Sequence, residues 1–187
     1  MFNRSLHILF LAALWVAPSY ALSAPEKSAQ PAVKAKQTAR AGVSDFTLDT
    51  IDGDSVSLSD YKGKVIVVSF WATWCKPCIQ ELGFLKKLSK KLSKDIVILA
   101  ISTDGPDSVS AVEEKAQAKG LDMPVLLDTS GDVFAQFNPE GSLPFSVYID
   151  RNGKLHSTHD GFATGDDIKI EKVVKLLVAE QAGKAKK

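Results

Sequence analysis

Cysteine is scarce in this sequence, with two residues in a chain of 187. Cys75 and Cys78 therefore carry all of its thiol chemistry, and no further cysteine is left for a framework of structural disulfides. Long apolar runs are also missing, because Leu6–Ala17 spans about a dozen residues whereas a transmembrane helix needs about 20. The formal net charge is only +1, so the composition does not indicate a nucleic acid or another polyanion as a partner.

The N-terminal segment has the layout of a secretory signal peptide over residues 1–24. Arg4 supplies a short positive region, the apolar stretch follows, and small residues come next. Cleavage is expected after Ala21, Ser23 or Ala24, and the sequence does not separate the three sites. The segment does not end in cysteine, which disfavours a lipid anchor. We therefore expect a periplasmic or otherwise extracytoplasmic protein, with an uncleaved membrane tether as the alternative.

Residues 25–41 lack aromatic side chains and any useful periodicity. They are rich in Ala, Lys, Pro and Gln, which is typical of a flexible basic linker. The rest of the chain, residues 42–187, carries the alternating apolar patterns of a folded domain. The hydrophobic content of 45% for the whole sequence suits a globular core. We expect a single domain after the linker, and we expect it to be a monomer.

The domain is organised around a strand that runs into a helix. The apolar run from Val65 to Phe70, which starts with the β-branched residues 65–68, predicts a buried central strand. A helix is predicted from about Cys75 to Lys91, because apolar residues recur there at helical spacing. These residues are Ile79, Leu82, Leu85, Leu88 and Leu92. Pro77 fits the first helical turn, where a missing N–H costs nothing. Both cysteines therefore lie at a helix N-terminus.

This position favours thiolate chemistry. A thiolate is the nucleophile in disulfide exchange, and a helix N-terminus stabilises its negative charge. Cys75 should meet free N–H groups, whereas Cys78 lies about one turn further in and should be more buried. We expect Cys75 to attack or be attacked, and Cys78 to resolve the mixed disulfide. Lys76 adds a cation beside the pair, and Trp74 is expected to shield one side of it.

Other interpretations of the pair are weaker. A structural disulfide with this spacing would close a very small loop and gain little entropy. A zinc site or a thiol-based metallochaperone would need His156 or His159 as further ligands. A strand would point these two histidines to opposite faces, which disfavours a shared metal site. We expect both to be strand residues near the surface. A peroxidase is disfavoured because the two cysteines look like an exchange pair.

The stretch Phe70–Cys78, which reads FWATWCKPC, resembles the active-site motif of the thioredoxin superfamily. Two features of the sequence, the Ala-Thr-Trp segment of this stretch and Glu81 three residues after the second cysteine, resemble the extracytoplasmic TlpA-like and ResA-like thiol–disulfide oxidoreductases. The resemblance covers roughly residues 43–180 and includes Pro124–Asp128 and Leu143–Gly153. It implies a thioredoxin-like α/β fold with an N-terminal β-hairpin extension and a central α/β insertion.

The resemblance also implies a catalytic role for Glu81. One hypothesis is a partly buried carboxylate with a raised pKa that exchanges protons with Cys78. The alternative is an ordinary solvated glutamate on a helix. Ser69 stands where many thioredoxins carry a buried Asp, and its hydroxyl does not titrate usefully, which favours Glu81. Gly83 departs from the Pro that is common in the family and kinks the helix.

The resemblance implies a second functional element at Leu143 and Pro144. In the superfamily the matching proline is cis and packs against the disulfide, and the residue before it offers its backbone to the substrate. Phe145 departs from the common Thr and is expected to widen the apolar docking surface or narrow the choice of partner. The predicted substrate-binding residues are Trp74, Lys76, Pro77, Leu143 and Pro144.

The remaining patterns alternate between strands and helices. A hairpin is predicted around Asp52-Gly53, and a second one around Asp150–Gly153. Strands are predicted at 96–102, 124–127 and 145–149. Helices are predicted at 108–119, 131–137 and 168–181, the first of them capped by Asp107 or Ser108 and the last by Asp166 or Asp167. The alternation predicts parallel neighbours and a substrate at the carboxyl edge of the sheet, where Cys75 lies.

The predicted function is that of an exported thiol–disulfide oxidoreductase that reduces disulfides of client proteins. No organic cofactor or metal is required beyond the redox-active disulfide. The resemblance implies re-reduction by a membrane thiol transporter of the CcdA or DsbD kind, and clients such as apocytochrome c or copper-site proteins. An oxidant or isomerase is the alternative, because the Lys-Pro between the cysteines does not decide the direction.

Overall fold

The computed structural model describes residues 42–182. The predicted signal peptide and linker lie outside the described residues. Among those that are described, no helix has both the length and the apolar character needed to cross a membrane.

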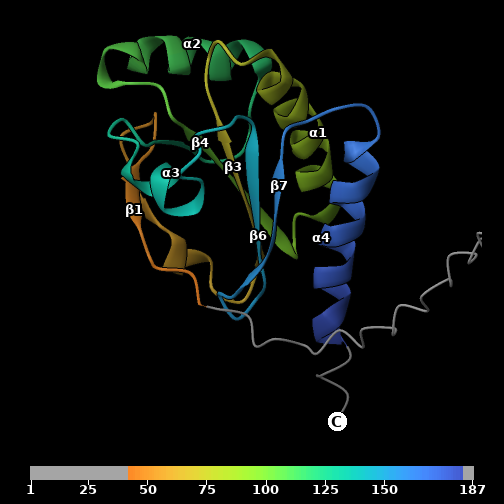
Figure 1. Ribbon diagram of the computed structural model, residues 1–187. Coiled ribbons are helices and arrows are strands. Elements are labelled where there is room, and N and C mark those ends of the chain that lie inside the picture. Colours follow the sequence, from red (N-terminus) through yellow and green to blue (C-terminus); the bar gives the residue numbers. More distant parts are fainter. Residues whose placement is uncertain (1–41, 183–187) are drawn as a thin grey trace, which may run out of the picture. The chain divides into compact units, whose positions relative to one another are not determined.

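A five-stranded sheet forms the centre of the fold (Figure 1). Its strands are β3 (Val65–Trp71), β4 (Ile96–Ser102), β5 (Val125–Leu127), β6 (Phe145–Ile149) and β7 (Leu155–Asp160). Their order across the sheet is β5-β4-β3-β6-β7, so β3 is central. β3, β4 and β5 are parallel, as the strand–helix alternation predicted, whereas β6 and β7 are antiparallel to their neighbours.

The predicted N-terminal hairpin is present as β1 (Thr47–Asp49) and β2 (Ser55–Ser57), which pair antiparallel. It docks at the β5 edge, where Thr50 forms a bridge with Leu126 and the Ile51 N–H donates to the Val125 carbonyl at 3.0 Å. Its residue Phe46 and the following Leu58 are buried in the core on that side of the sheet.

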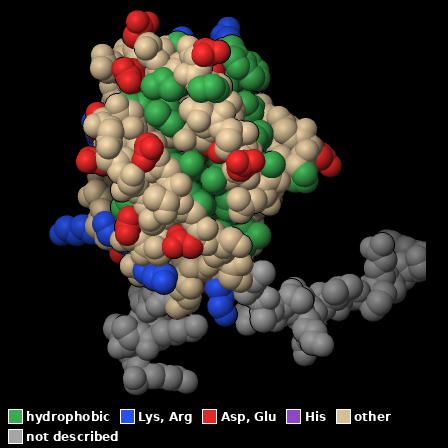
Figure 2. Space-filling view, turned by 90° about the vertical axis from the view of Figure 1, so that its left-hand side faces the viewer, with side chains coloured by type: hydrophobic (Ala, Val, Ile, Leu, Met, Phe, Trp, Pro, Cys, Tyr) green, Lys and Arg blue, Asp and Glu red, His purple; other side chains and the backbone are tan. Residues whose placement is uncertain are grey.

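Helices cover both faces of the sheet (Figure 1). They are α1 (Lys76–Leu92), α2 (Val109–Lys119), α3 (Asp132–Phe137) and α4 (Asp166–Ala182). Buried residues of α1, α2 and α4 share one core cluster, whereas α3 and the hairpin contribute to the other. Figure 2 shows the hairpin side, where Asp and Glu side chains are scattered among apolar ones.

β3 explains why there are two cores. Val65 and Val67 face the cluster under α1, while Ile66 and Val68 face the opposite cluster, as expected for a strand with a period of two. Every residue of β3 is buried, which is why the sequence reads as an apolar run. Ser69 is the polar exception on the α1 side, and its hydroxyl needs a partner there.

Some local predictions were wrong. Ser108 precedes α2, but its side chain makes no capping hydrogen bond, and a 3₁₀ turn at Pro106–Ser108 leads into the helix instead. α4 begins at Asp166, two residues before the predicted start. Phe145 is only 8% exposed and belongs to the core on the hairpin side, so it does not widen a docking surface.

Candidate functional site

Cys75 and Cys78 form a disulfide at the start of α1, with an S–S distance of 1.97 Å. Cys75 is the N-cap residue, and the Cys78 backbone N–H donates to its sulfur at 3.3 Å. Pro77 lies in the first turn, where it removes no helical hydrogen bond. The contacts that meet Cys75 Sγ in the oxidised protein would also stabilise a thiolate in the reduced one.

The two sulfurs differ in accessibility. Cys75 keeps 4% of its surface exposed, and Cys78 keeps none. This is the order that the helix position predicted. An incoming sulfur therefore reaches Cys75 first, and Cys78 is left to act from inside the protein.

Glu81 is fully buried on the face of α1 that meets the sheet. Ser146 Oγ of β6 donates to its Oε1 at 2.7 Å, and Ser69 Oγ of β3 donates to its Oε2 at 3.1 Å. The two serines are direct partners in the β3–β6 ladder, so the sheet presents both hydroxyls together. The alternative of an ordinary solvated glutamate is therefore excluded.

The protonation of Glu81 follows from this environment. Burial raises its pKa from 4.5 to about 7, the hydrogen bonds from Ser146 and Ser69 oppose the rise, and the negative charge of Asp166 adds to it. Cys78 lies three residues earlier on the same helix and is also fully buried, so the two side chains share one helix face. A carboxyl group with this pKa can accept a thiol proton near neutral pH.

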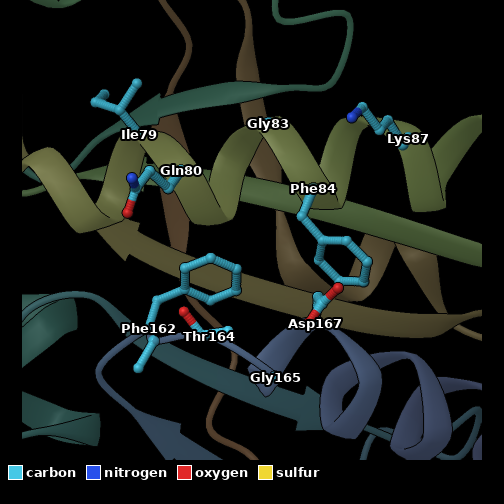
Figure 3. A pocket seen from close by; sticks show the side chains of 10 residues that line it. Ile79, Gln80, Gly83, Phe84, Lys87, Phe162, Thr164, Gly165 and Asp167 are labelled. Carbon is cyan, nitrogen blue, oxygen red and sulfur yellow. The ribbon is translucent and has the colours of Figure 1, made fainter.

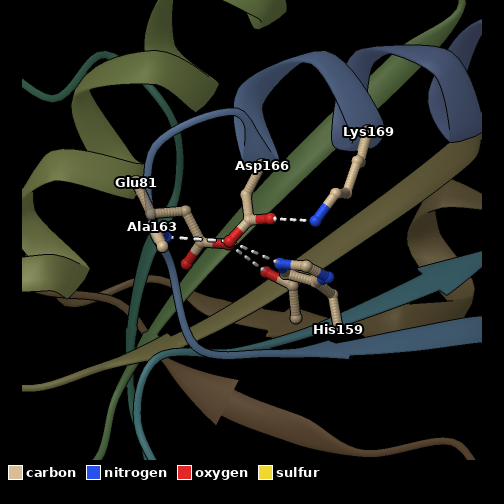
Figure 4. Close-up of polar contacts among 6 residues, drawn as sticks. Glu81, His159, Ala163, Asp166 and Lys169 are labelled. Carbon is tan, nitrogen blue, oxygen red and sulfur yellow. Dashed lines mark hydrogen bonds and ion pairs between the residues drawn. The ribbon is translucent and has the colours of Figure 1, made fainter.

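A second carboxylate, Asp166, lies at the outer end of the same cluster (Figure 4). It accepts the Ala163 backbone N–H at 2.8 Å and pairs with Lys169 Nζ at 2.8 Å. His159 Nε2 lies 3.4 Å from its Oδ2. The hydrogen bond from Lys169 is the largest cause that lowers the pKa of Asp166 to about 2.

Tyr148 completes the buried polar cluster. It is 2% exposed, and its hydroxyl has no hydrogen-bond partner among the described residues. Burial, and then the charge of Glu81, raise its pKa well above the ordinary value of 10. Tyr148 therefore stays protonated near neutral pH, whereas Glu81 can change its protonation there.

The Leu143–Pro144 peptide bond is cis, as the resemblance implied. Pro144 is buried, and its carbonyl accepts the Gly161 backbone N–H at 2.8 Å. Leu143 packs against the core cluster that contains both cysteines. The structure thus brings this element next to the helix that carries the disulfide.

Trp74 lies at the surface, and its shielding of the pair stays a prediction. Its side chain is 74% exposed, which makes it a prominent apolar group on the surface directly before Cys75. Lys76 follows the cysteine and is also exposed. Both residues are therefore placed to meet a partner.

The two histidines are not gathered around the cysteines. His159 lies beside Asp166, and His156 Nδ1 is 2.9 Å from Ser157 Oγ. Across residues 42–182, no three His, Cys, Asp or Glu side chains are grouped so that they could hold a metal ion.

Sequence reasoning missed Ser146 and the influence of Asp166 on Glu81. A signal for Ser146 exists, since it is the polar residue in the otherwise apolar strand Phe145–Ile149, and Ser69 occupies the equivalent place in β3. Two polar residues in adjacent buried strands indicate that they share a polar partner. Asp166 has no such signal, because an acidic residue at a helix start is common.

Comparisons with known proteins agree with this geometry. Residues 40–158 match the family model described as the AhpC/TSA family. The chain is 36% identical to the thioredoxin-like protein YneN of Bacillus subtilis over 121 residues, which is 64% of this chain and 70% of that protein. It is also 36% identical to the thiol-disulfide oxidoreductase ResA of Geobacillus kaustophilus over 125 residues, covering 66% of this chain and 70% of that protein.

Among solved structures, the exposed lipoprotein thioredoxin Etrx1 of Streptococcus pneumoniae is similar. Its TM-score is 0.58 at 37% sequence identity, and the match covers 72% of this chain and all (100%) of that one. The thioredoxin-like fold predicted from the sequence is therefore confirmed.

Proposed function

The chain belongs to the AhpC/TSA family, and from this premise we propose that it is a thiol–disulfide oxidoreductase that reduces disulfides in extracytoplasmic client proteins. One observation carries the proposal. A disulfide stands at the N-terminus of α1, and a carboxyl group with a pKa of about 7 lies one turn further along the helix from its inner cysteine.

The reaction proceeds in two exchanges. The Cys75 thiolate attacks one sulfur of the client disulfide, and the other client sulfur leaves as a thiolate. Cys78 then gives its proton to Glu81 and attacks Cys75 Sγ, which releases the second client thiolate. Two electrons pass from the cysteine pair to the client, and the Cys75–Cys78 bond of this structure is formed.

The surroundings of Glu81 suit this step. Its carboxylate accepts the proton in a site closed to bulk solvent, and Ser69 and Ser146 hold both of its oxygens in place. Leu143 would offer its backbone to the client, and Trp74, Lys76 and Pro77 would contact the client beside Cys75. Each turnover leaves Glu81 protonated, so the proton must leave before the next one.

The finer parts of the proposal concern partners and location. A membrane thiol transporter of the CcdA or DsbD kind would re-reduce the pair, and apocytochrome c or copper-site proteins would be clients. The names of the relatives support exchange chemistry, and the predicted signal peptide supports an extracytoplasmic site. An oxidising compartment makes a dedicated electron donor necessary, because the pair would otherwise stay oxidised.

The test is the reduction potential of the Cys75–Cys78 pair, measured by equilibrium with a thiol buffer. A potential near or below about −270 mV supports a reductase, because this is the thioredoxin end of the scale. A potential near about −120 mV, the DsbA end, would make the protein an oxidant. Cys78→Ser should accumulate a mixed disulfide with an added client, whereas Cys75→Ser should form none.

A further inference from the structure

Gly83 is a glycine that the fold does not require. It lies in the interior of α1, outside the set of glycines with a positive φ, and a Cβ built on it meets nothing within 4 Å. Glycine weakens a helix interior relative to alanine, because it loses more conformational freedom on folding. Local structure thus gives no reason for the missing side chain, and the reason has to lie in the space beside it.

That space is a groove with a volume of about 780 Å³ between α1 and the segment that leads from β7 into α4 (Figure 3). Gly83 lines it from the helix, between Ile79 and Lys87 on the same helix face. Phe84 and Phe162 stack across it, with ring centroids 6.5 Å apart and planes inclined by 27°. Any side chain at position 83 would project into this space.

The groove adjoins the exchange site, because Ile79 and Gln80 line both the groove and a neighbouring hollow beside Trp74 and Lys76. On the α1 side it begins at Ile79, which directly follows Cys78. On the other side it begins at Phe162, which follows Gly161, and Gly161 donates its backbone N–H to the Pro144 carbonyl at 2.8 Å. A chain that reacts with Cys75 and lies along Pro144 would therefore pass next to the groove.

We propose that this groove receives an apolar side chain that flanks the reacting cysteine of a client polypeptide, and that Gly83 keeps the groove open for it. The proposal rests on the proposed function and adds a specificity determinant to it. Apolar contact with Ile79, Phe84 and Phe162 would supply the attraction, since these side chains lose water when they are covered.

The shape of the groove favours a polypeptide over a small free ligand. It is open along one side, so a small molecule would stay largely exposed to water, whereas binding sites for such molecules bury most of the ligand. A client side chain needs less enclosure, because the exchange reaction already holds its backbone nearby. Lys87 and Asp167 lie on opposite walls and leave the lining without a dominant charge.

The experiment compares two disulfide-linked peptides that differ at one position beside the cysteine, Leu in one and Gly in the other. The native protein should reduce the Leu peptide with a kcat/KM roughly tenfold higher, as expected for one buried apolar side chain. Gly83→Leu should remove this preference while the reduction of glutathione disulfide, which has no apolar flank, stays unchanged.

Two further variants separate docking from stability. Gly83→Ala should raise the melting temperature, because it restores helix propensity, and should lower the preference only in part. Gln117→Leu is the matched control, since it adds the same side chain to the exposed face of α2 and should leave the preference intact. A native protein without the preference, or a Gly83→Leu variant that keeps it, would overturn the proposal.

Binding without chemistry distinguishes this inference from the proposed function. Peptides with Ser in place of Cys are titrated into the oxidised protein, and chemical shifts of the groove residues are followed. Tighter binding of the Leu peptide to the native protein than to Gly83→Leu supports the groove even if no disulfide is reduced. Equal binding to both overturns the groove even if reduction is fast.

Discussion

Glu81 and Asp166 are two carboxylates in similar positions with opposite properties. Glu81 lies in the second turn of α1 and Asp166 at the first residue of α4, and both contribute to the polar cluster between these helices and the sheet (Figure 4). The pKa of Glu81 is raised to about 7, whereas the pKa of Asp166 is lowered to about 2.

The two pKa values differ because the two carboxylates have different hydrogen-bond partners. Glu81 receives two uncharged serine hydroxyls and no cation, and it has no contact with solvent. Asp166 receives a backbone N–H and the ammonium of Lys169, whose side chain is 71% exposed. Hydroxyl donors hold a carboxylate in position without offsetting the full cost of its burial, whereas a cation does offset it. The site thus has a proton acceptor near pH 7 and a fixed charge beside it.

The largest effect is expected from Glu81→Gln, which removes the proton acceptor and keeps the shape. The release of a mixed disulfide by Cys78 should slow by roughly 100-fold, the lower part of the range for general base catalysis. In the native protein this rate should rise as pH rises through about 7, because Glu81 accepts a proton only when ionised. The variant should lose that rise in stopped-flow measurements.

Asp166→Asn is the control for this measurement, because it keeps Glu81 intact. Its rate should still rise with pH in the same region. If Glu81→Gln and the native protein show the same pH profile, Glu81 does not exchange protons with Cys78, and the contrast between the two carboxylates has no catalytic meaning.

The next largest effect is on the free energy of unfolding. Its dependence on pH through Glu81 should be opposite in sign to its dependence through Asp166. The pKa of Glu81 is higher in the folded protein than its ordinary value of 4.5, so its contribution is fully present below pH 4.5 and is lost as pH rises through about 7. The two pKa values correspond to about 3 kcal/mol. The free energy of unfolding of the native protein, relative to Glu81→Gln, should fall by about this amount between pH 4.5 and 8.

The contribution of Asp166 to the free energy of unfolding should change in the acid pH range. Its pKa is lower in the folded protein, so its contribution is present above pH 3.8 and is lost as pH falls through about 2. Urea unfolding of the oxidised protein at several pH values measures both trends. A native protein whose stability relative to Glu81→Gln is constant from pH 5 to 8 would show that Glu81 is not held in a dry site.

Much of this site could be predicted from local sequence. The apolar run up to Phe70, the helical pattern after Cys78 and Pro77 place the cysteines at a helix N-terminus, because strands and amphipathic helices have short-range signatures. The burial of Glu81 was also within reach, since its position on α1 is fixed by the apolar residues Leu82 and Leu85 beside it.

Long-range contacts could not be predicted in this way. Ser146 is 65 residues from Glu81 in the sequence, and only the β3–β6 register brings its hydroxyl to the carboxylate. Phe145 was expected at the docking surface, but one step along a strand reverses the face, and it lies in the opposite core. The exposure of Trp74 depends on what packs over it, which a motif does not specify.

A smaller effect on the pKa of Glu81 should distinguish its two serine partners, Ser146 and Ser69. Ser146→Ala and Ser69→Ala each remove one donor from the Glu81 carboxylate, so each should raise its pKa further, by roughly one unit for Ser146. The hydrogen bond from Ser146 lowers the pKa more than that from Ser69, in keeping with distances of 2.7 Å and 3.1 Å. The measurement is the pH at which the release of the mixed disulfide by Cys78 reaches half its maximal rate. This pH should rise more in Ser146→Ala than in Ser69→Ala, and equal values would contradict the prediction.

The smallest effect concerns the charge of Asp166 acting on Glu81. This charge is the weakest of the causes that set the pKa of Glu81, so Asp166→Asn should lower that pKa by roughly a few tenths of a unit, since interactions between separated charges near the surface are screened. His159→Gln should act in the opposite direction, because it removes the electrostatic influence of His159 on the Asp166 carboxylate. His156→Gln is the matched control on the opposite face of β7 and should leave the pKa of Glu81 unchanged.

The carboxyl resonance of Glu81, followed by NMR across pH 5–9, has the resolution to separate these variants. A rise in the pKa of Glu81 in Asp166→Asn would show that Asp166 acts by holding the N-terminus of α4 in place and not through its charge.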